Sequence, residues 1–197
     1  AMWRCDSCIV SHNAFDFCVR GYSHGVYNRG QDSAGILMFE ENTNNIIGNN
    51  SATHGGDGLF GFGGRDALGQ VWMDEQRKGL REKHGRDDVD DLIELTDDRI
   101  KLYTRRGNND NLIIGNDFSY AAAHGIEMTF SFGNRILGNR LVGNAICGVW
   151  GGYSQDTLIA LNTIESNGEF AYGLERGGIN IEHGRGNIIT KNQFKNN

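Results

Sequence analysis

The sequence of 197 residues contains no proline. About ten prolines would be expected in a chain of this length at the average frequency of about 5%. Proline cannot donate a backbone hydrogen bond, so it is kept out of strands that are paired on both sides. Its complete absence is therefore typical of a chain in which most strands are central strands.

Other absences restrict the partners that the chain can have. No apolar run is long enough to span a membrane, and no secretory signal peptide is visible. The net charge is −6 without a stripe of basic residues, which argues against nucleic acid as a partner. The Gly-rich segment 58–64 lacks the Lys-Ser/Thr of a nucleotide-binding loop, and no Asp-rich segment has a calcium-binding pattern.

Glycine, in contrast, is abundant, with 29 residues, and much of it belongs to a repeat. A glycine followed by Ile, Val or Leu stands nine positions before a short block of Asn and Ile, and it returns fourteen positions after the start of that block. The period is therefore 23 residues, as from Gly125 to Gly148. Self-similarity at this period predicts a solenoid, in which each coil buries its apolar face only by stacking on its neighbours. The clearest members are Gly35, Gly58, Gly125, Gly148 and Gly178.

The Asn/Ile block has the pattern Asn-x-Ile-x-x-Asn, followed two positions later by an apolar residue. Alternation at a period of two predicts short strands. Asn tolerates the left-handed backbone of a sharp turn, and identical Asn side chains on stacked coils can hydrogen-bond to one another. We expect Ile46 and Ile113 in one core column, and Ser51 as an interruption of another. The stacked Asn column is predicted to contain Asn13, Asn49, Asn116, Asn139, Asn162 and Asn192.

These repeats resemble those of right-handed parallel β-helix proteins, the pectate-lyase-like superfamily with its NosD-like and carbohydrate-binding or sugar-hydrolase members. The resemblance covers residues 5–64 and 108–197. It implies an all-β fold, a right-handed single-stranded parallel β-helix with coils of 23 residues. It says little about the reaction, because the superfamily includes lyases, hydrolases, epimerases and phage tailspikes. It also implies a secreted, periplasmic or cell-surface protein.

We expect one domain over residues 1–197, interrupted by insertions. The largest separates Gly58 from the next Asn block by 53 residues, where nine are expected. This charged excursion, residues 65–107, is predicted to contain one amphipathic helix and a second, short one. Since insertions in solenoids often lie on the binding face, we expect it to roof part of that face, a charged flap being the alternative. Smaller insertions fall at residues 20–32 and 167–176.

The beginning of the chain leaves no room for a capping element, because the first repeat block starts at Cys8. Solenoids need caps at both ends. We therefore expect a fragment that lacks its N-terminal cap, with the rest of a longer chain, or a partner, covering the first coil.

The cysteines near the N-terminus resemble a zinc knuckle only superficially. Cys5, Cys8 and Cys18 accompany His12, but Cys8 and Cys18 occupy positions that Asn takes in later coils. This placement favours buried structural thiols over zinc, since free cysteine packs as a small hydrophobic residue. We predict neither a metal nor a cofactor; calcium is compatible with the chain, but no motif supports it.

Function is expected to reside in side chains that point outward from the strand after each repeated glycine. The second position after the glycine places Glu127, Trp150 and Asn180 on consecutive coils, about 5 Å apart. The position before the glycine makes Asp57 and His124 neighbours, an arrangement that can orient an imidazole for proton transfer. Such a face of aromatic and carboxylate side chains suits a polysaccharide or oligosaccharide. The fourth and fifth positions add Tyr153, Glu182 and His183.

Three hypotheses remain open. A glycoside hydrolase would use two carboxylates, and Glu127 and Glu182, two coils or about 10 Å apart, are the expected pair. A polysaccharide lyase would use His124 or His183 as its base, and Arg176 would neutralise the uronate. The third is a non-catalytic carbohydrate-binding or structural module of a larger protein, in which the aromatic side chains pack under the insertion and the histidines are turn residues.

Overall fold

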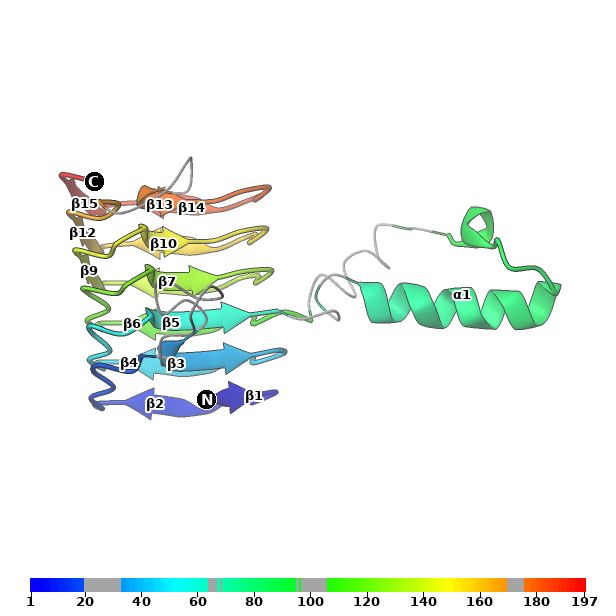
Figure 1. Ribbon diagram of the computed structural model, residues 1–197, viewed down its shortest axis with the longest axis horizontal. Helices are drawn as coiled ribbons and strands as arrows, with labels where there is room; N and C mark the ends of the chain where they lie inside the picture. The colour runs from blue at the N-terminus through cyan, green and yellow to red at the C-terminus, as the bar shows by residue number, and fades with distance from the viewer. Residues whose placement is uncertain (20–32, 64–66, 68, 95, 97–105, 170–175) are drawn as a thin grey trace, which may run out of the picture.

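The computed structural model describes residues 1–19, 33–63, 67, 69–94, 96, 106–169 and 176–197. Short parallel strands form three sheets in which each strand pairs with strands of the preceding and following repeats. The repeats are stacked as flat coils, with the N-terminus at one end of the stack and the C-terminus at the other (Figure 1). This is the single-stranded parallel β-helix that the 23-residue period predicts.

The first sheet runs the whole length of the stack and contains the strand around each repeated glycine. Its register aligns the apolar residues that follow the glycines, as Leu59 with Ile126 and Ile126 with Val149, and these side chains form one column of the core. In spatial order its six strands are β1 (Met2–Trp3), β3 (Ala34–Phe39), β5 (Asp57–Phe62), β7 (His124–Met128), β10 (Cys147–Trp150) and β13 (Gly177–Asn180).

The Asn/Ile blocks form the second sheet, and a third sheet follows in the last three coils. In the earlier coils, isolated bridges such as that between Ser51 and Asp117 take the place of the third sheet. The second sheet contains β2 (Ile9–Ser11), β4 (Ile46–Gly48), β6 (Leu112–Ile114), β8 (Arg135–Leu137), β11 (Leu158–Ala160) and β14 (Ile188–Thr190). The third contains β9 (Arg140–Val142), β12 (Thr163–Glu165) and β15 (Gln193–Lys195).

The repeated glycine is required because the backbone is crowded where each first-sheet strand turns inward. A Cβ atom added to Gly58 would lie 2.5 Å from the carbonyl oxygen of Gly125 and 2.6 Å from the Cβ of Phe118. A Cβ atom added to Gly125 would lie 2.7 Å from the Nδ2 of Asn144. Only a residue without a side chain permits so close an approach of the backbone.

The predicted ladder of Asn side chains exists, with one correction in the second coil. The member of that coil is Asn50, whose Nδ2 donates to the Oδ1 of Asn116 at 3.0 Å. Asn49, the predicted member, is exposed and adopts a left-handed backbone with φ of 55°. The prediction of Asn49 was therefore wrong by one position.

An additional residue in the turn after β3 causes this shift. A step that takes four residues in the first coil takes five here, from Met38 to Thr43. Two consecutive residues in this turn, Glu40 and Glu41, adopt positive φ. The spacing rule from the preceding glycine therefore fails by one residue in this coil.

Because of the same one-residue shift, two further predictions for this coil were wrong. Ile47, and not Ile46, pairs with Ile113 in the core, while Ile46 is exposed. Ala52 fills the apolar position for which Ser51 was expected, so that the column is not interrupted.

The Asn ladder hydrogen-bonds the buried backbone of one coil to the next. The Oδ1 of Asn139 accepts from the backbone N–H and the Nδ2 of Asn116, both at 2.9 Å. Its own Nδ2 donates to the carbonyl oxygen of Ile113 and to the Oδ1 of Asn162. An unpaired buried polar group costs about 1–3 kcal/mol. Each ladder amide therefore stabilises the coil, because it pairs several buried polar groups at once. Similar ladders join Asn45, Asn111 and Asn134, and also Asn144, Asn167 and Asn197.

The excursion between β5 and β6 contains the two predicted helical segments. They are α1 (Gln70–His84) and a short 3-10 helix, η1 (Asp90–Leu92). Gly85 ends α1 in a left-handed conformation. The guanidinium of Arg77 on α1 lies 2.8 Å from the carboxylate of Asp90 and so joins the two segments. Within the described residues, no helix is long and apolar enough to cross a membrane.

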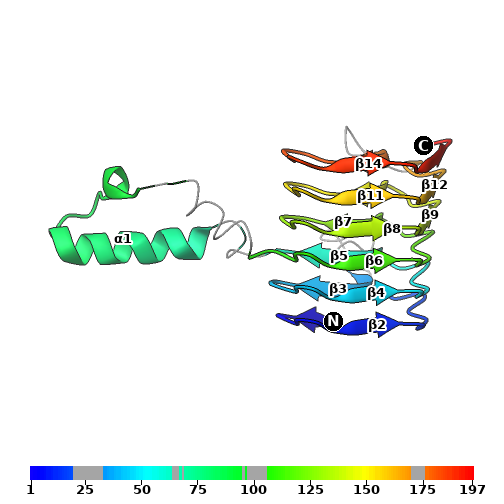
Figure 2. The ribbon, with the colours of Figure 1, turned by 180° about the vertical axis from the view of Figure 1, so that it is seen from behind.

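The expectation that this excursion roofs the outward face of the first sheet was wrong for α1. Figures 1 and 2 show α1 beside the stack, beyond the turns that follow the first-sheet strands. None of the residues of α1 is buried. β5 and β6 nevertheless belong to one coil, since they pair with β7 and β8 of the next coil. The insertion predicted at residues 20–32, and residues 170–175 of the other small insertion, lie outside the described residues.

Candidate functional site

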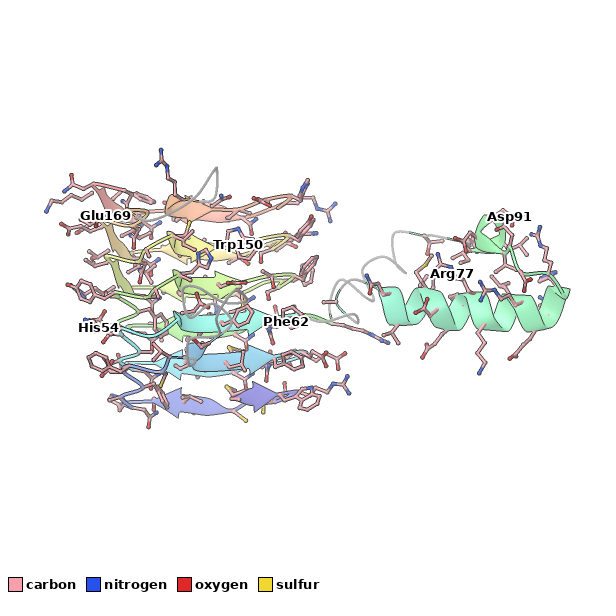
Figure 3. All side chains as sticks on the ribbon, viewed as in Figure 1. His54, Phe62, Arg77, Asp91, Trp150 and Glu169 are labelled. Atoms are coloured by element: carbon pink, nitrogen blue, oxygen red, sulfur yellow. The ribbon has the colours of Figure 1, made fainter. Side chains whose placement is uncertain are left out.

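The register of the first sheet brings three of the predicted site residues together. Trp150 pairs with Glu127 on one side and with Asn180 on the other. All three side chains are partly accessible. They form the outward column that was predicted from the period, and Figure 3 shows Trp150 on the first-sheet side of the stack.

Asp57 and His124 are also neighbours, as predicted, but their contact runs through the backbone. The backbone N–H of His124 donates to the Oδ1 of Asp57 at 2.8 Å. Asp57 is 1% exposed and His124 is 7% exposed. The hydrogen bond holds one carboxylate oxygen of Asp57 in place beside the start of β7.

Two consecutive inward positions in β7 place the side chain of Glu127 on the same side as that of His124. Side chains three residues apart on a regular strand point to opposite faces. In β7, however, Ile126 is fully buried, and a Cβ on Gly125 would also point into the coil. With two consecutive residues turned inward, His124 and Glu127 both face outward, and the imidazole Nε2 lies 3.7 Å from the Glu127 Oε2.

The result is a compact group of ionisable side chains, the Asp57–His124–Glu127 cluster. One ligand atom from each of the three residues lies within 4.8 Å of the others. The cluster has the donor atoms of a metal site, an imidazole nitrogen and two carboxylates. The expectation of no metal rested on linear motifs, which do not contain this group, because its residues are brought together by the 23-residue register and by the two consecutive inward positions of β7.

Trp150 covers the imidazole of the cluster. Its indole stacks on the His124 ring at a centroid distance of 5.5 Å and an interplanar angle of 17°. Its Nε1 is buried and has no hydrogen-bond partner among the described residues. Trp150 thus both orients His124 and keeps part of its own surface accessible.

Tyr153 and His183 belong to a different structure, a stack of rings in the turn after the first-sheet strands. Tyr153 lies 4.6 Å from the ring of Phe130 and 4.9 Å from that of His183, nearly parallel to both. All three residues have positive φ. Because both faces of Tyr153 are covered, a sugar ring cannot stack on it in this arrangement, and only its edge is exposed.

The remaining predicted residues lie outside the Asp57–His124–Glu127 cluster. Glu182 is in the last coil and is not among the carboxylates of the cluster. Arg176 is exposed just before β13, beside a concavity that it lines with Ser166, Glu169 and Asn197. The expected Glu127–Glu182 pair is therefore less compact than the group around His124.

A second histidine, His54, also stacks on aromatic rings, but it is not part of a cluster of ionisable side chains. His54 lies between Phe17 and Tyr120, with ring centroids 5.0 Å from each. Arg140 lies over Tyr120 and hydrogen-bonds its hydroxyl at 3.2 Å, which raises the pKa of the guanidinium. These residues stabilise a turn, and among the described residues His54 belongs to no group of three ligand-type side chains such as the one around His124.

Comparisons with known proteins agree with the fold. A family model described as a right-handed β-helix region matches residues 96–197. Among solved structures, the Azotobacter vinelandii mannuronan C-5 epimerase AlgE4 A-module is similar, with a TM-score of 0.51 and 15% sequence identity. The alignment covers 82% of this chain and 44% of that one, so the chain spans less than half of that structure's length. A comparison with curated proteins gave no match.

Proposed function

This chain belongs to the right-handed β-helix family, and we propose that it acts on a polysaccharide bound along the outward face of β5, β7, β10 and β13. The observation that carries the proposal is the Asp57–His124–Glu127 cluster beneath Trp150. The solved relative, a mannuronan C-5 epimerase, shows that this fold serves a polysaccharide-modifying enzyme elsewhere, and it supports the proposal only to that extent.

The proposed reaction is removal of the proton next to the carboxylate of a uronate sugar, which begins an elimination or an epimerisation. Such a step needs a proton acceptor beside the sugar ring and stabilisation of the charge that develops. The cluster offers the acceptor: the proton passes from the sugar carbon to the imidazole of His124, and the two neighbouring carboxylates stabilise the positive charge that the imidazole then carries. They do not stabilise the negative charge left on the sugar, which must be met by other groups of the complex.

A hydrolase mechanism is supported less well by this geometry. Hydrolases need two carboxyl groups that flank the glycosidic bond. Asp57 is 1% exposed and its Oδ1 is already bonded to the His124 backbone, so its carboxylate is poorly placed to reach a sugar. Glu182 and Glu127 stand two coils apart in different columns.

Trp150 and Asn180 are the proposed sugar contacts. They lie on consecutive coils beside Glu127, so a chain bound along the stack would meet them in order. The indole offers apolar surface, and the amide of Asn180 can donate to and accept from hydroxyl groups.

The test is an assay on a panel of uronate-containing and neutral polysaccharides. We expect unsaturated products, detected by ultraviolet absorbance, or a changed uronate composition, detected by NMR. His124→Gln and Glu127→Gln should lower the rate by about 10²–10⁴-fold. Glu82→Gln, on the exposed surface of α1, is the matched control and should leave it unchanged.

Release of reducing ends without unsaturation would favour a hydrolase. Retention on a polysaccharide affinity gel without any product would favour the non-catalytic module. We also propose that the protein works outside the cytoplasm, where polymeric glycans are found. Fractionation of cells that express the full-length gene tests this, and recovery in the cytoplasm alone would contradict it.

A further inference from the structure

We propose that two copies of the chain associate through the outward face of the second sheet, packed face to face with their stacks running in opposite directions. The contact is symmetric, so that each copy offers the same surface to the other. This inference is independent of the proposed function, because the site around His124 lies on the first sheet.

The outward face of the second sheet is aliphatic over nearly its whole height. The register aligns one outward side chain from each of the six strands, which Figure 2 shows stacked from β2 to β14. The apolar members are exposed or half-buried, with Ile9 67% and Ile188 59% exposed. This outward column contains Ile9, Ile46, Leu112, Arg135, Leu158 and Ile188.

The strands of this sheet carry apolar side chains on both of their faces. β6 (Leu112–Ile114) and β11 (Leu158–Ala160) are each apolar at three consecutive positions, although only the middle residue points into the core. Continuous apolar runs of this kind are typical of parallel sheets that are covered on both faces. The pattern therefore indicates that the outward face of the second sheet is covered as well.

The third sheet shows that the coil itself does not require an aliphatic outward face. In β12, Ile164 is buried in the core, whereas its neighbours Thr163 and Glu165 point outward and are polar. The same stack thus has one outward face that suits water and one that suits an apolar partner.

A charged residue in the column restricts what that partner can be. Arg135 is exposed in β8, and Asp110 is exposed in the turn before β6. Neither side chain forms an ion pair with another described residue. A partner that covers Arg135 must offer it a carboxylate, because a buried charge without a partner is costly.

A second copy meets this requirement when a twofold axis runs along the strand direction. An axis at the centre of the sheet passes between β6 and β8, so that β8 of each copy lies opposite β6 of the other. Arg135 then faces Leu112 of the other copy, beside Asp110, which stands two residues before that leucine. The strands of the two copies keep one direction, as in aligned packing of two sheets.

The same axis matches apolar residues at the remaining strands. β11 lies opposite β4, and β14 lies opposite β2. Leu158 therefore meets Ile46, and Ile188 meets Ile9, in both halves of the interface. Symmetry also forms the pair of Arg135 and Asp110 twice.

The size of the face predicts a weak and reversible dimer. Six strands about 4.8 Å apart and three residues of about 3.3 Å each give a surface of about 29 Å by 10 Å. This is well below the roughly 800 Å² that each partner buries in an interface of standard size. We therefore expect a dissociation constant of about 10–100 µM.

Sedimentation velocity of the full chain, from about 1 to 500 µM, tests the association across this range. We expect a shift from monomer to dimer. Ile46→Glu should weaken the dimer by about tenfold or more, because each new carboxylate would be desolvated against Leu158 of the other copy. Thr163→Glu, on the polar outward face of the third sheet, is the matched control and should leave the dissociation constant unchanged.

An exchange of charges tests the antiparallel register. Arg135→Asp alone and Asp110→Arg alone should each weaken the dimer by about tenfold, because like charges would then face each other across the interface. The chain with both substitutions should recover the dissociation constant of the parent to within about threefold.

Circular dichroism shows whether each variant is folded, and the charge exchange decides the matter if Ile46→Glu does not fold. A chain that stays monomeric over the whole range overturns the proposal. A dimer that resists Ile46→Glu, or that Thr163→Glu weakens equally, also overturns it, and so does a double variant that shows no recovery. A monomer whose face binds an apolar fluorescent dye, with the binding lost in Ile46→Glu, would indicate a different partner and overturn the second copy as the occupant.

Discussion

Two kinds of residue column run along this solenoid, and they differ in uniformity. The Asn ladder repeats one residue type at successive coils, as in Asn116, Asn139 and Asn162, because each coil must make the same turn and satisfy the same backbone groups. The outward column of the first sheet changes at every coil, as from Glu127 to Trp150. Uniform columns build the coil, and variable columns are free to carry chemistry.

The largest expected effect distinguishes a ladder position from its neighbour. Asn50→Gly should lower the free energy of unfolding by about 2–3 kcal/mol, because it removes four hydrogen bonds to Asn13, Val10 and Asn116. Asn49→Gly should cost little, since glycine accepts the left-handed backbone of that exposed position. Urea denaturation measures both, and equal losses would contradict the corrected register.

A pair of glycine substitutions compares the coil with the excursion. Gly58→Ala should destabilise the chain by about 1–3 kcal/mol, because the new Cβ would collide with Gly125 and Phe118. Gly79→Ala should instead stabilise α1 by about 0.5–1 kcal/mol, since nothing lies within 4 Å of that position in the helix. Thermal unfolding gives the sign of each change, and tolerance of Gly58→Ala would show that the coil relaxes.

The uniform columns were the part of the fold that could be predicted from sequence. Repetition at a fixed period places residues without any knowledge of the turns, provided that each turn has the same length. The second coil breaks that condition, because Glu40 and Glu41 both adopt left-handed backbone. Glutamate is not a residue type that indicates a left-handed backbone. The one-residue shift from Asn49 to Asn50 could therefore not be predicted.

For the candidate site, the neighbours across adjacent strands were predictable, and the arrangement of the side chains was not. The period placed Asp57 beside His124, and Glu127 beside Trp150. The closeness of His124 to Glu127 depends on the two consecutive inward positions, Gly125 and Ile126, which a period-two pattern does not contain. The position of α1 was likewise unpredictable, because the repeat describes the coils alone and does not place an element that is inserted between them.

Two stacked aromatic rings allow structure to be separated from function. Trp150→Ala and Tyr120→Ala each remove a ring stacked on a histidine and should each cost about 1 kcal/mol of stability. Only Trp150→Ala should slow conversion of the polysaccharide, because His54 is not part of the cluster. Equal effects on the rate would show that Trp150 acts through stability alone.

The smallest expected effect concerns a single carboxylate in the first coil. Asp16 accepts hydrogen bonds from the hydroxyl of Ser51 and from the backbone and hydroxyl of Thr53, which hold the pKa of its carboxyl below the ordinary value. Because the folded-state pKa is the lower one, this contribution is present above pH about 4 and is lost as the pH falls through the folded-state pKa. Asp16 is partly exposed, so the contribution should stay below about 1 kcal/mol.

Asp16→Asn should therefore lower the free energy of unfolding at pH 7. It should also flatten the decline of that free energy between about pH 5 and pH 3, the range in which aspartate titrates. Asp88→Asn, in the exposed segment between α1 and η1, serves as the control. Urea unfolding at several pH values makes the comparison. If both variants decline in parallel with the parent chain, the hydrogen bonds of Asp16 contribute nothing to the folded state, and the edge of the first coil is held by its backbone bridges, such as Ala14 with Ser51, rather than by this side chain.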